Sequence, residues 1–311
     1  MLLKKTRGNR EEARLSRVRH EAIYQAIQEE HRYPNQALCK LGHVSRAAYY
    51  KWLHRAAPAY EIENERIAGE IEKIHMDSPD KGYRRIRDEL ARYHSINVND
   101  KRVLRLCRIR GIKSTIKYAN HGCTRQAKNP QYIAANILNR EFTADAPNQK
   151  WLTDVTEFKY YTGVEVHKIY LSAILDLYDR RIVAYTIGDS NNNALVFNMF
   201  DQAVAENPDA TPLFHSDRGY QYTSRIFHAK LEAAGMRQSM SRVAHCIDNG
   251  PMEGFWGILK RERYYGRRFL DRTSLVKMIE DYISYYNNRR LQRNLGVLTP
   301  MEKHNQYKIA A

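Results

Sequence analysis

Cysteine is scarce in this sequence of 311 residues, and long apolar segments are absent. None of the cysteines forms a CxxC pair, which argues against a disulfide framework and against a zinc ribbon. No apolar run approaches the ~20 residues that a transmembrane helix needs. The basic N-terminal segment also lacks the apolar stretch of a secretory signal. We therefore expect a soluble, cytoplasmic protein without a membrane partner.

Acidic residues are outnumbered, and mainly in one half of the chain. There are 51 Lys and Arg against 35 Asp and Glu, a formal net charge of +16. Residues 1–145 hold 29 basic and 17 acidic side chains, whereas residues 146–311 hold 22 and 18. A general solubilising charge would not gather at one end. The imbalance therefore indicates a nucleic-acid-binding front half joined to a nearly neutral rear half.

The N-terminal region, which we delimit as residues 1–58, is expected to be helical. Apolar positions at helical spacing predict helices over 10–30, 35–41 and 45–55, with a glycine turn between the last two. Two short helices around such a turn are typical of a helix-turn-helix, in which Arg46 would reach DNA. An ordinary helical hairpin has the same spacing and remains an alternative.

A second helical region is expected over residues 59–112. Its last helix has an apolar arc on one side and, on the other, a basic ridge made by Lys101, Arg105 and Arg108. Such a ridge suits a helix lying in the major groove of DNA, although a solvated surface helix is the alternative. Residues 113–145, beginning near Lys113, lack sustained periodicity. They are interpreted as an extended basic linker along DNA phosphates, or as a disordered tether.

From residue 146 the pattern changes to strands, and we assign residues 146–290 to one core domain. The first three expected strands have short connections, which require antiparallel neighbours. Later strands alternate with helices, so the sheet should be mixed. The expected strands are 151–161, 167–177, 182–187, 213–216 and 237–240. A helix ending near residue 288 should cover the sheet, followed by a tail over 291–311.

Three acidic residues of this core stand where a purely structural role is hard to assign. Asp154 lies in the middle of a strand, Asp217 follows a short buried strand, and Glu253 lies in the first turn of a helix that Pro251 opens. Carboxylates suit Mg²⁺, and two such ions assist displacement at a phosphodiester. Ion pairs with the many arginines are the alternative. By contrast, Asp176 ends a strand and is interpreted as structural, as is Asp179 in the turn after it.

The motifs around these residues resemble a known family. "HSDRGYQYTS", "DNGPMEGFWG" and "YYNNRRLQRNLGVLTP", with Lys260 seven residues after Glu253, resemble the OrfB-type transposases of bacterial insertion sequences. These share the DDE core of retroviral integrases, which has a ribonuclease-H-like fold. The resemblance runs from about residue 82 onward. It implies that Asp154, Asp217 and Glu253 are catalytic and hold Mg²⁺, with Mn²⁺ as a substitute, and that Lys260 contacts DNA nearby.

The resemblance also bears on partners. The segment "GYRRI" resembles the second helix-turn-helix of this family, which implies DNA contacts by Arg84 and Arg85. Arg289, in the C-terminal part of the resemblance, is available to DNA as well. The implied partners are double-stranded DNA (terminal inverted repeats and target), further copies of the chain, and an OrfA product or frameshift fusion. Trp256 departs from the family, in which phenylalanine is commoner at this position.

Together these features predict an α+β multidomain protein. Its N-terminal helix-turn-helix regions precede a ribonuclease-H-like mixed α/β core and a C-terminal helix. The predicted function is Mg²⁺-dependent DNA cleavage and strand transfer at the ends of an insertion sequence. A structure-selective nuclease is one alternative, but it would have little use for two helix-turn-helix units. A non-catalytic DNA-binding regulator is another, and it would leave three carboxylates without a role.

Overall fold

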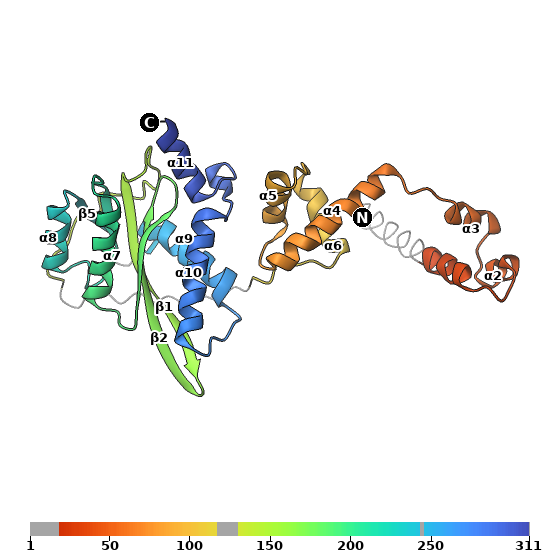
Figure 1. Cartoon of the computed structure of the whole chain (residues 1–311), viewed down its shortest axis with the longest axis horizontal. Helices are drawn as coiled ribbons and strands as arrows, with labels where there is room; N and C mark the ends of the chain where they lie inside the picture. Colours follow the sequence, from red (N-terminus) through yellow and green to blue (C-terminus); the bar gives the residue numbers. More distant parts are fainter. Residues whose placement is uncertain (1–18, 117–129, 243–245, 311) are drawn as a thin grey trace, which may run out of the picture. The chain divides into compact units, whose positions relative to one another are not determined.

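The computed structural model describes residues 19–116, 130–242 and 246–310 (Figure 1). The chain divides into two compact units, Met1–Ile67 and Ala68–Ala311. The start of the expected first helix and the centre of the expected linker lie outside the described residues. No helix in the described ranges is long and apolar enough to cross a membrane.

The first unit contains the predicted pair of short helices. Helical backbone at 19–29 is followed by α2 (Asn35–Leu41) and α3 (Arg46–Leu53). Ser45 caps α3, because its Oγ accepts a hydrogen bond of 3.1 Å from the backbone N–H of Ala48. A small core of Ile27, Cys39 and Tyr49 holds the helices together. The prediction of two helices around the glycine turn is confirmed.

Three further helices precede the sheet: α4 (Ala59–Asp77), α5 (Tyr83–Tyr93) and α6 (Asp100–Ile109). In α6, the side chain of Asn99 accepts a 2.8 Å hydrogen bond from the N–H of Arg102 and so caps the helix. One face of α6 buries Val103 and Leu106, whereas Lys101, Arg105 and Arg108 are exposed on the other. This is the amphipathic arrangement that the sequence predicts.

The core domain is built on a five-stranded mixed sheet with the order β3-β2-β1-β4-β5. Its strands are β1 (Lys150–Thr162), β2 (Glu165–Asp176), β3 (Ile182–Gly188), β4 (Leu213–Ser216) and β5 (Arg237–Met240). Short turns make β1, β2 and β3 antiparallel neighbours. Helical connections make β4 parallel to β1, and β5 parallel to β4. The mixed sheet is therefore confirmed.

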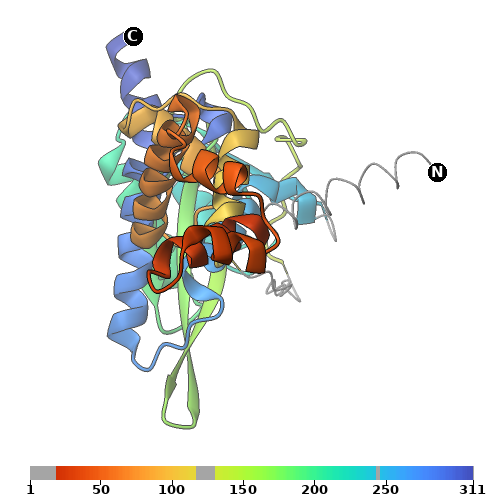
Figure 2. The ribbon, with the colours of Figure 1, turned by 90° about the vertical axis from the view of Figure 1, so that its right-hand side faces the viewer.

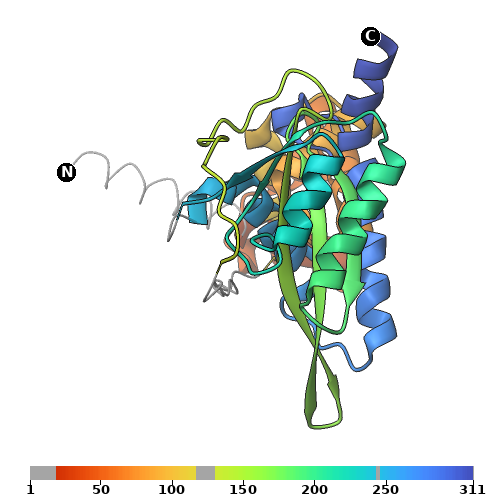
Figure 3. The same ribbon diagram turned by 90° about the vertical axis from the view of Figure 1, so that its left-hand side faces the viewer.

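Helices cover both faces of the sheet. Figure 3 looks onto the face covered by α7 (Asn193–Glu206) and α8 (Arg225–Ala233). The other face packs on α9 (Gly250–Leu259) and α10 (Arg272–Asn288). The β1 strand serves both layers, since Trp151 joins the first core and Leu152 the second. The β1–β2 hairpin extends beyond the rest of the sheet (Figure 2).

The C-terminal segment, expected only as a tail over 291–311, contains a helix. Helix α11 (Pro300–Ala310) starts with a capping box: Thr299 Oγ1 accepts from the N–H of Glu302 at 3.1 Å, and Glu302 Oε2 accepts from the N–H of Thr299 at 3.0 Å. Between the core helices, the π-helix η2 (Lys260–Tyr264) continues α9 directly. The remaining short elements are η1 (Cys246–Asn249) and η3 (Arg293–Leu295).

Candidate active site

The sheet brings Asp154 and Asp217 to the same level. Strands β1 and β4 are parallel neighbours in which Leu152 pairs with His215. Each aspartate lies two residues beyond its member of that pair, so Asp154 on β1 and Asp217 directly after β4 occupy corresponding positions. Residues at this end of neighbouring parallel strands form the usual site of an open α/β sheet.

Helix α9 supplies Glu253 in its first turn and is bound to β1. The side-chain N–H of Asn249, just before α9, donates to the carbonyl oxygen of Thr153 at 3.0 Å. One turn after Glu253, the indole N–H of Trp256 donates to Asp154 Oδ2 at 3.1 Å. These two bonds, on either side of Glu253, hold the first turn of α9 beside Asp154.

The three acidic groups act on one another electrostatically. Burial, followed by the nearby Asp217 and then Glu253, raises the pKa of Asp154 to about 8. Burial also raises the pKa of Asp217. The pKa of Glu253 is raised by partial burial and by Asp217. Like charges have this effect only over short distances, so the three carboxyl groups lie near one another.

None of the three forms an ion pair with an arginine or lysine within the described ranges, whereas other carboxylates of the core do. Asp248, for example, is paired with both Arg140 and Arg242. These arginines hold the pKa of Asp248 far below its usual range. The alternative interpretation, in which Asp154, Asp217 and Glu253 pair with arginines, therefore has no support in this structure.

The donor chemistry of the site suits a hard divalent cation. Three carboxyl groups with raised pKa values and no basic ion-pair partner would be stabilised in their ionised form by such an ion. In the part of the chain that the structure describes, however, no group of three or more His, Cys, Asp or Glu side chains is already arranged around one ion position.

Other polar residues near the site are explained by packing. His215 is buried between Ser239 and Ser241, with ring nitrogens 2.8 and 3.1 Å from their Oγ atoms. Burial lowers the pKa of His215 to about 4, so it is neutral at physiological pH. It is the packed histidine that the strand pattern predicts. The hydroxyl of Tyr222 lies 3.2 Å from Thr153 Oγ1 behind the aspartates, and its pKa is raised by burial and by their charges.

Asp176 and Asp179 form a separate, buried cluster away from the three carboxylates. Asp176 Oδ2 accepts from the backbone N–H of Asn148 at 2.6 Å, and Asp179 Oδ2 lies 2.7 Å from His304 Nδ1 on α11. Burial raises the pKa of each aspartate to about 6. These contacts support the structural role that the sequence predicts for both aspartates. The contact of His304 with Asp179 is not among the predictions from sequence. The capping box at the start of α11 is nevertheless a local signal for the helix that carries His304.

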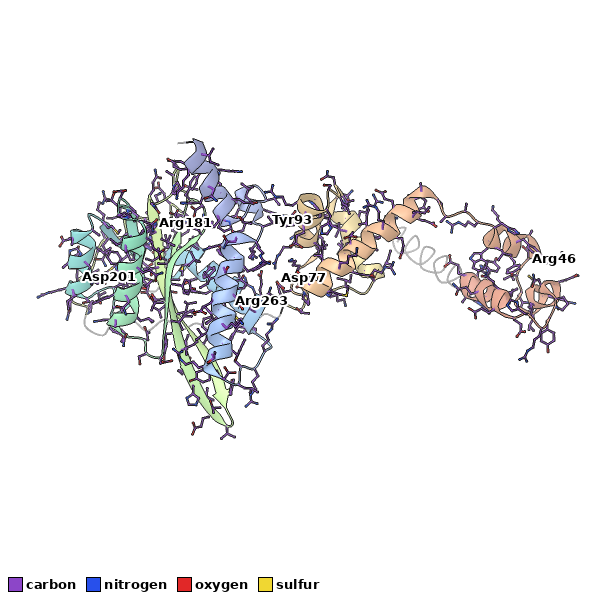
Figure 4. All side chains as sticks on the ribbon, in the orientation of Figure 1. Arg46, Asp77, Tyr93, Arg181, Asp201 and Arg263 are labelled. Atoms are coloured by element: carbon purple, nitrogen blue, oxygen red, sulfur yellow. The ribbon has the colours of Figure 1, made fainter. Side chains whose placement is uncertain are left out.

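Most of the residues expected to contact DNA are exposed. Those with exposed side chains are Arg46 on α3, Arg84 on α5, Lys101, Arg105 and Arg108 on α6, then Lys113, and Arg289 after α10. Figure 4 shows Arg46 within the first unit. Lys260 is partly buried at the start of η2, where its Nζ lies 5.1 Å from the ring centre of Phe158.

Arg289 lies on a cleft of about 920 Å³ between the end of α4, α5, η2 and α10. Asp77, Tyr93 and Arg263, which also line it, are labelled in Figure 4. The three carboxylates do not line this cleft. The cavity is therefore distinct from the candidate active site.

Arg85 lies inside an ionic cluster centred on Glu262 of η2, which we call the Glu262 cluster. The Arg85 guanidinium donates to Glu262 Oε1 at 2.8 Å and to the hydroxyl of Tyr285 at 2.6 Å. Arg290 donates to the same Oε1 at 2.8 Å, and the hydroxyl of Tyr282 donates to Oε2 at 2.9 Å. The Glu262 cluster thus attaches α5 to η2, the segment that follows α9.

A second clamp attaches α6 to the C-terminal segment. Arg293 donates to Asp88 of α5 at 2.7 Å and to Asp100, the first residue of α6, at 3.1 Å. Helices α5 and α6 are therefore attached to the core at two points. Because these partners are about 200 residues apart in the chain, no local pattern indicates them.

Comparison with known families and proteins agrees with this architecture. The integrase core domain matches residues 144–246, and a second profile of that description matches 253–307. Asp154 and Asp217 lie in the first match, and Glu253 is the first residue of the second. An HTH-like domain matches residues 61–120, a range that includes α5 and α6.

Similar proteins come from bacterial mobile elements. The putative transposase InsK of insertion sequence element IS150 from Escherichia coli K12 is 35% identical over 276 residues, covering 88% of this chain and 94% of InsK. An uncharacterised transposase-like protein of Haemophilus influenzae is 41% identical over 216 residues, covering 68% and 95%. Among solved structures, the catalytic core domain of HTLV-2 integrase in complex with magnesium has a TM-score of 0.40 and 21% identity, covering 51% and 98%.

Proposed function

Because the chain belongs to the insertion-sequence transposases that carry an integrase core domain, we propose that it cuts DNA at the ends of such an element and joins them to target DNA. The observation that carries the proposal is the group of Asp154, Asp217 and Glu253. Asp154 lies on β1, Asp217 directly follows β4, and Glu253 lies in the first turn of α9. Asp217 and Glu253 raise the pKa of Asp154, and Asp217 raises the pKa of Glu253. None of the three has an arginine or lysine ion-pair partner within the described ranges. A structural role would favour ion pairs instead.

The proposed reaction consists of two displacements at phosphorus. In the first, a water oxygen bonds to phosphorus at the element end while the bond to the 3′ oxygen breaks, which frees a 3′-hydroxyl. In the second, that hydroxyl bonds to a target phosphorus, whose own 3′ oxygen leaves. Since both steps are in-line, one site serves both, and no covalent intermediate with the enzyme is needed.

The three carboxylates are proposed to hold Mg²⁺, for which Mn²⁺ would substitute. When bound there, the ions would activate the attacking oxygen and stabilise the leaving oxygen. Asp154 and Asp217 are held by adjacent strands, so they supply a fixed pair of ligands. Glu253 is exposed at the start of α9 and would adjust to complete the set.

DNA contacts are proposed for basic side chains on several elements. The exposed ridge on α6, consisting of Lys101, Arg105 and Arg108, would enter the major groove. Lys260 would contact the backbone beside the active site. Arg46, Arg84, Lys113 and Arg289 are exposed and would bind phosphates. Arg85 would contribute to DNA binding only indirectly, because its guanidinium is bound within the Glu262 cluster.

The proposed division of labour follows the expected regions. Residues 1–58 and 59–112 would bind the terminal inverted repeats, 113–145 would run along the DNA, and 146–290 would carry out catalysis, with 291–311 holding the second clamp. Cutting two element ends would require more than one copy of the chain. An OrfA product, separate or fused, would add to end recognition. Because the proposed substrate is bacterial DNA, we place this activity in the bacterial cytoplasm, at the nucleoid when the protein is bound to DNA.

The decisive experiment is a strand-transfer assay in Mg²⁺ that compares the intact protein with Glu253→Gln. Glu232→Gln on α8 is a matched control, because that carboxylate is 68% exposed and outside the site. We expect Glu253→Gln to bind DNA normally and to lose both cleavage and joining, while the control keeps both. Unchanged joining by Glu253→Gln would remove this residue from the site. Cleavage without joining by the intact protein would indicate a nuclease, and DNA binding alone a regulator.

A further inference from the structure

Trp256 connects two of the three proposed catalytic residues. Its indole N–H donates to Asp154 Oδ2 at 3.1 Å. Trp256 also lies three residues after Glu253 on α9, so the two side chains share one side of the helix. Trp256 thus contacts the carboxylate of Asp154 on β1 and belongs to α9, the helix that carries Glu253.

The environment of Trp256 makes this contact specific. Its side chain is only 6% exposed and packs against Phe255, with ring centres 5.1 Å apart. A buried indole N–H requires an acceptor, and the acceptor here is the Asp154 carboxylate. Phenylalanine, expected from the family resemblance, would fill much of the same space but has no N–H to donate. The hydrogen bond therefore depends on this chain having tryptophan at position 256.

We propose that Trp256 is a positioning residue for metal binding. Its N–H fixes the orientation of the Asp154 carboxylate and holds the first turns of α9 against β1, which sets Glu253 in relation to Asp154. This inference rests on the proposed function, because it assumes that both carboxylates hold the divalent cation. Groups that orient a ligand in this way typically change metal affinity or activity 10–100-fold when removed.

The test uses the three tryptophans of the chain, Trp52, Trp151 and Trp256. Trp256→Phe removes the N–H and keeps an aromatic ring. Trp151→Phe is the matched control, because Trp151 is also buried and its N–H also donates to an aspartate, Asp176, at 3.3 Å, but outside the site. We expect Trp256→Phe to raise the Mg²⁺ concentration for half-maximal cleavage about 10-fold or more. Its maximal rate should fall less, and Trp151→Phe should require the same Mg²⁺ as the intact protein.

Fluorescence provides a readout independent of activity. In the double variant Trp52→Phe/Trp151→Phe, Trp256 is the sole indole, and titration with Mg²⁺ should change its emission as Asp154 takes up the metal. The midpoint should match the Mg²⁺ requirement for cleavage. Emission that does not respond to Mg²⁺ would overturn the inference, even if Trp256→Phe failed to fold.

Failure of the inference and failure of the proposed function are distinguishable with Asp154→Asn. If Asp154→Asn abolishes cleavage while Trp256→Phe and Trp151→Phe have equal Mg²⁺ requirements, the positioning role is refuted and the catalytic assignment stands. If Asp154→Asn still cleaves, the assignment of Asp154 itself is refuted.

Discussion

Replacement of Glu262 should destabilise the second unit strongly. The Glu262 side chain is 3% exposed, and its partners Arg85 and Arg290 are only 20% and 12% exposed. Glu262→Gln keeps the shape but removes the charge, so two largely buried guanidinium groups lose a shared counterion. Arg85 retains Asp80 at 3.1 Å, whereas no second carboxylate partner of Arg290 is found among the described residues. Removing one partner of a buried ion pair typically costs ~3–5 kcal/mol.

We expect the lower part of that range, because glutamine still accepts a hydrogen bond from Tyr282. A loss of ~3 kcal/mol corresponds to a fall in Tm of roughly 6–12 °C for a domain of this size. Differential scanning calorimetry of the full chain measures the shift. The matched control is Asp201→Asn (Asp201 is labelled in Figure 4), which breaks an ion pair with Lys230 whose side chains are 55% and 33% exposed. Such a pair contributes about 0–1 kcal/mol.

The double variant Glu262→Met/Arg290→Met tests the physical reason. If the destabilisation comes from an unpaired buried charge, removing both partners should restore much of the lost stability. The reasoning is refuted if Glu262→Gln lowers Tm no more than Asp201→Asn does. It is also refuted if the double variant has a lower Tm than Glu262→Gln, because the replacement of Arg290 would then add a destabilisation of its own.

Two further predictions concern proton linkage and DNA binding. Because the pKa of Asp154 is raised to about 8 in the folded, metal-free protein, this carboxyl lowers stability as pH rises from about 4 to 8. Asp154→Asn should therefore raise the metal-free Tm at pH 8, with the gain shrinking toward pH 4; an equal gain at both values would contradict the shift. Arg105→Ala on the exposed ridge of α6 should weaken DNA binding and reduce the slope of log affinity against log salt by about 0.9 if one phosphate contact is lost. Arg92→Ala, which removes a residue paired with Glu302, should leave that slope unchanged in the same filter-binding or anisotropy measurement.

Much of the fold follows from periodicity and turn chemistry in the sequence. Short returns between β-branched segments predict the antiparallel strands, and strand–helix alternation predicts the parallel ones. The placement of Asp217 after a short buried strand, and of Glu253 just after a helix-opening proline, also follows from local sequence. Local sequence predicts these features because each depends on residues close together in the chain.

The long-range contacts were not predictable in this way. Arg84 and Arg85 are adjacent, yet one is exposed and the other enters the Glu262 cluster, 177 residues from its partner. Trp256 and Asp154 are likewise 102 residues apart. Whether a polar side chain meets solvent or a distant partner depends on tertiary packing, which composition and spacing do not encode. By contrast, the capping box of α11, made by Thr299 and Glu302, is a local signal for that helix.

The attachment of α5 and α6 to the core, by the Glu262 cluster and by Arg293, has a consequence for where DNA would be cut. Since Arg85 and Arg293 fasten these helices to the core, the ridge on α6 lies at a set separation from the aspartates on the sheet. If α6 reads the DNA as proposed, the cut would fall at a constant number of base pairs from the bases that α6 binds. Inserting one base pair, about 3.4 Å, between the two would shift the scissile bond out of register. An end altered in this way should still be held but no longer cut.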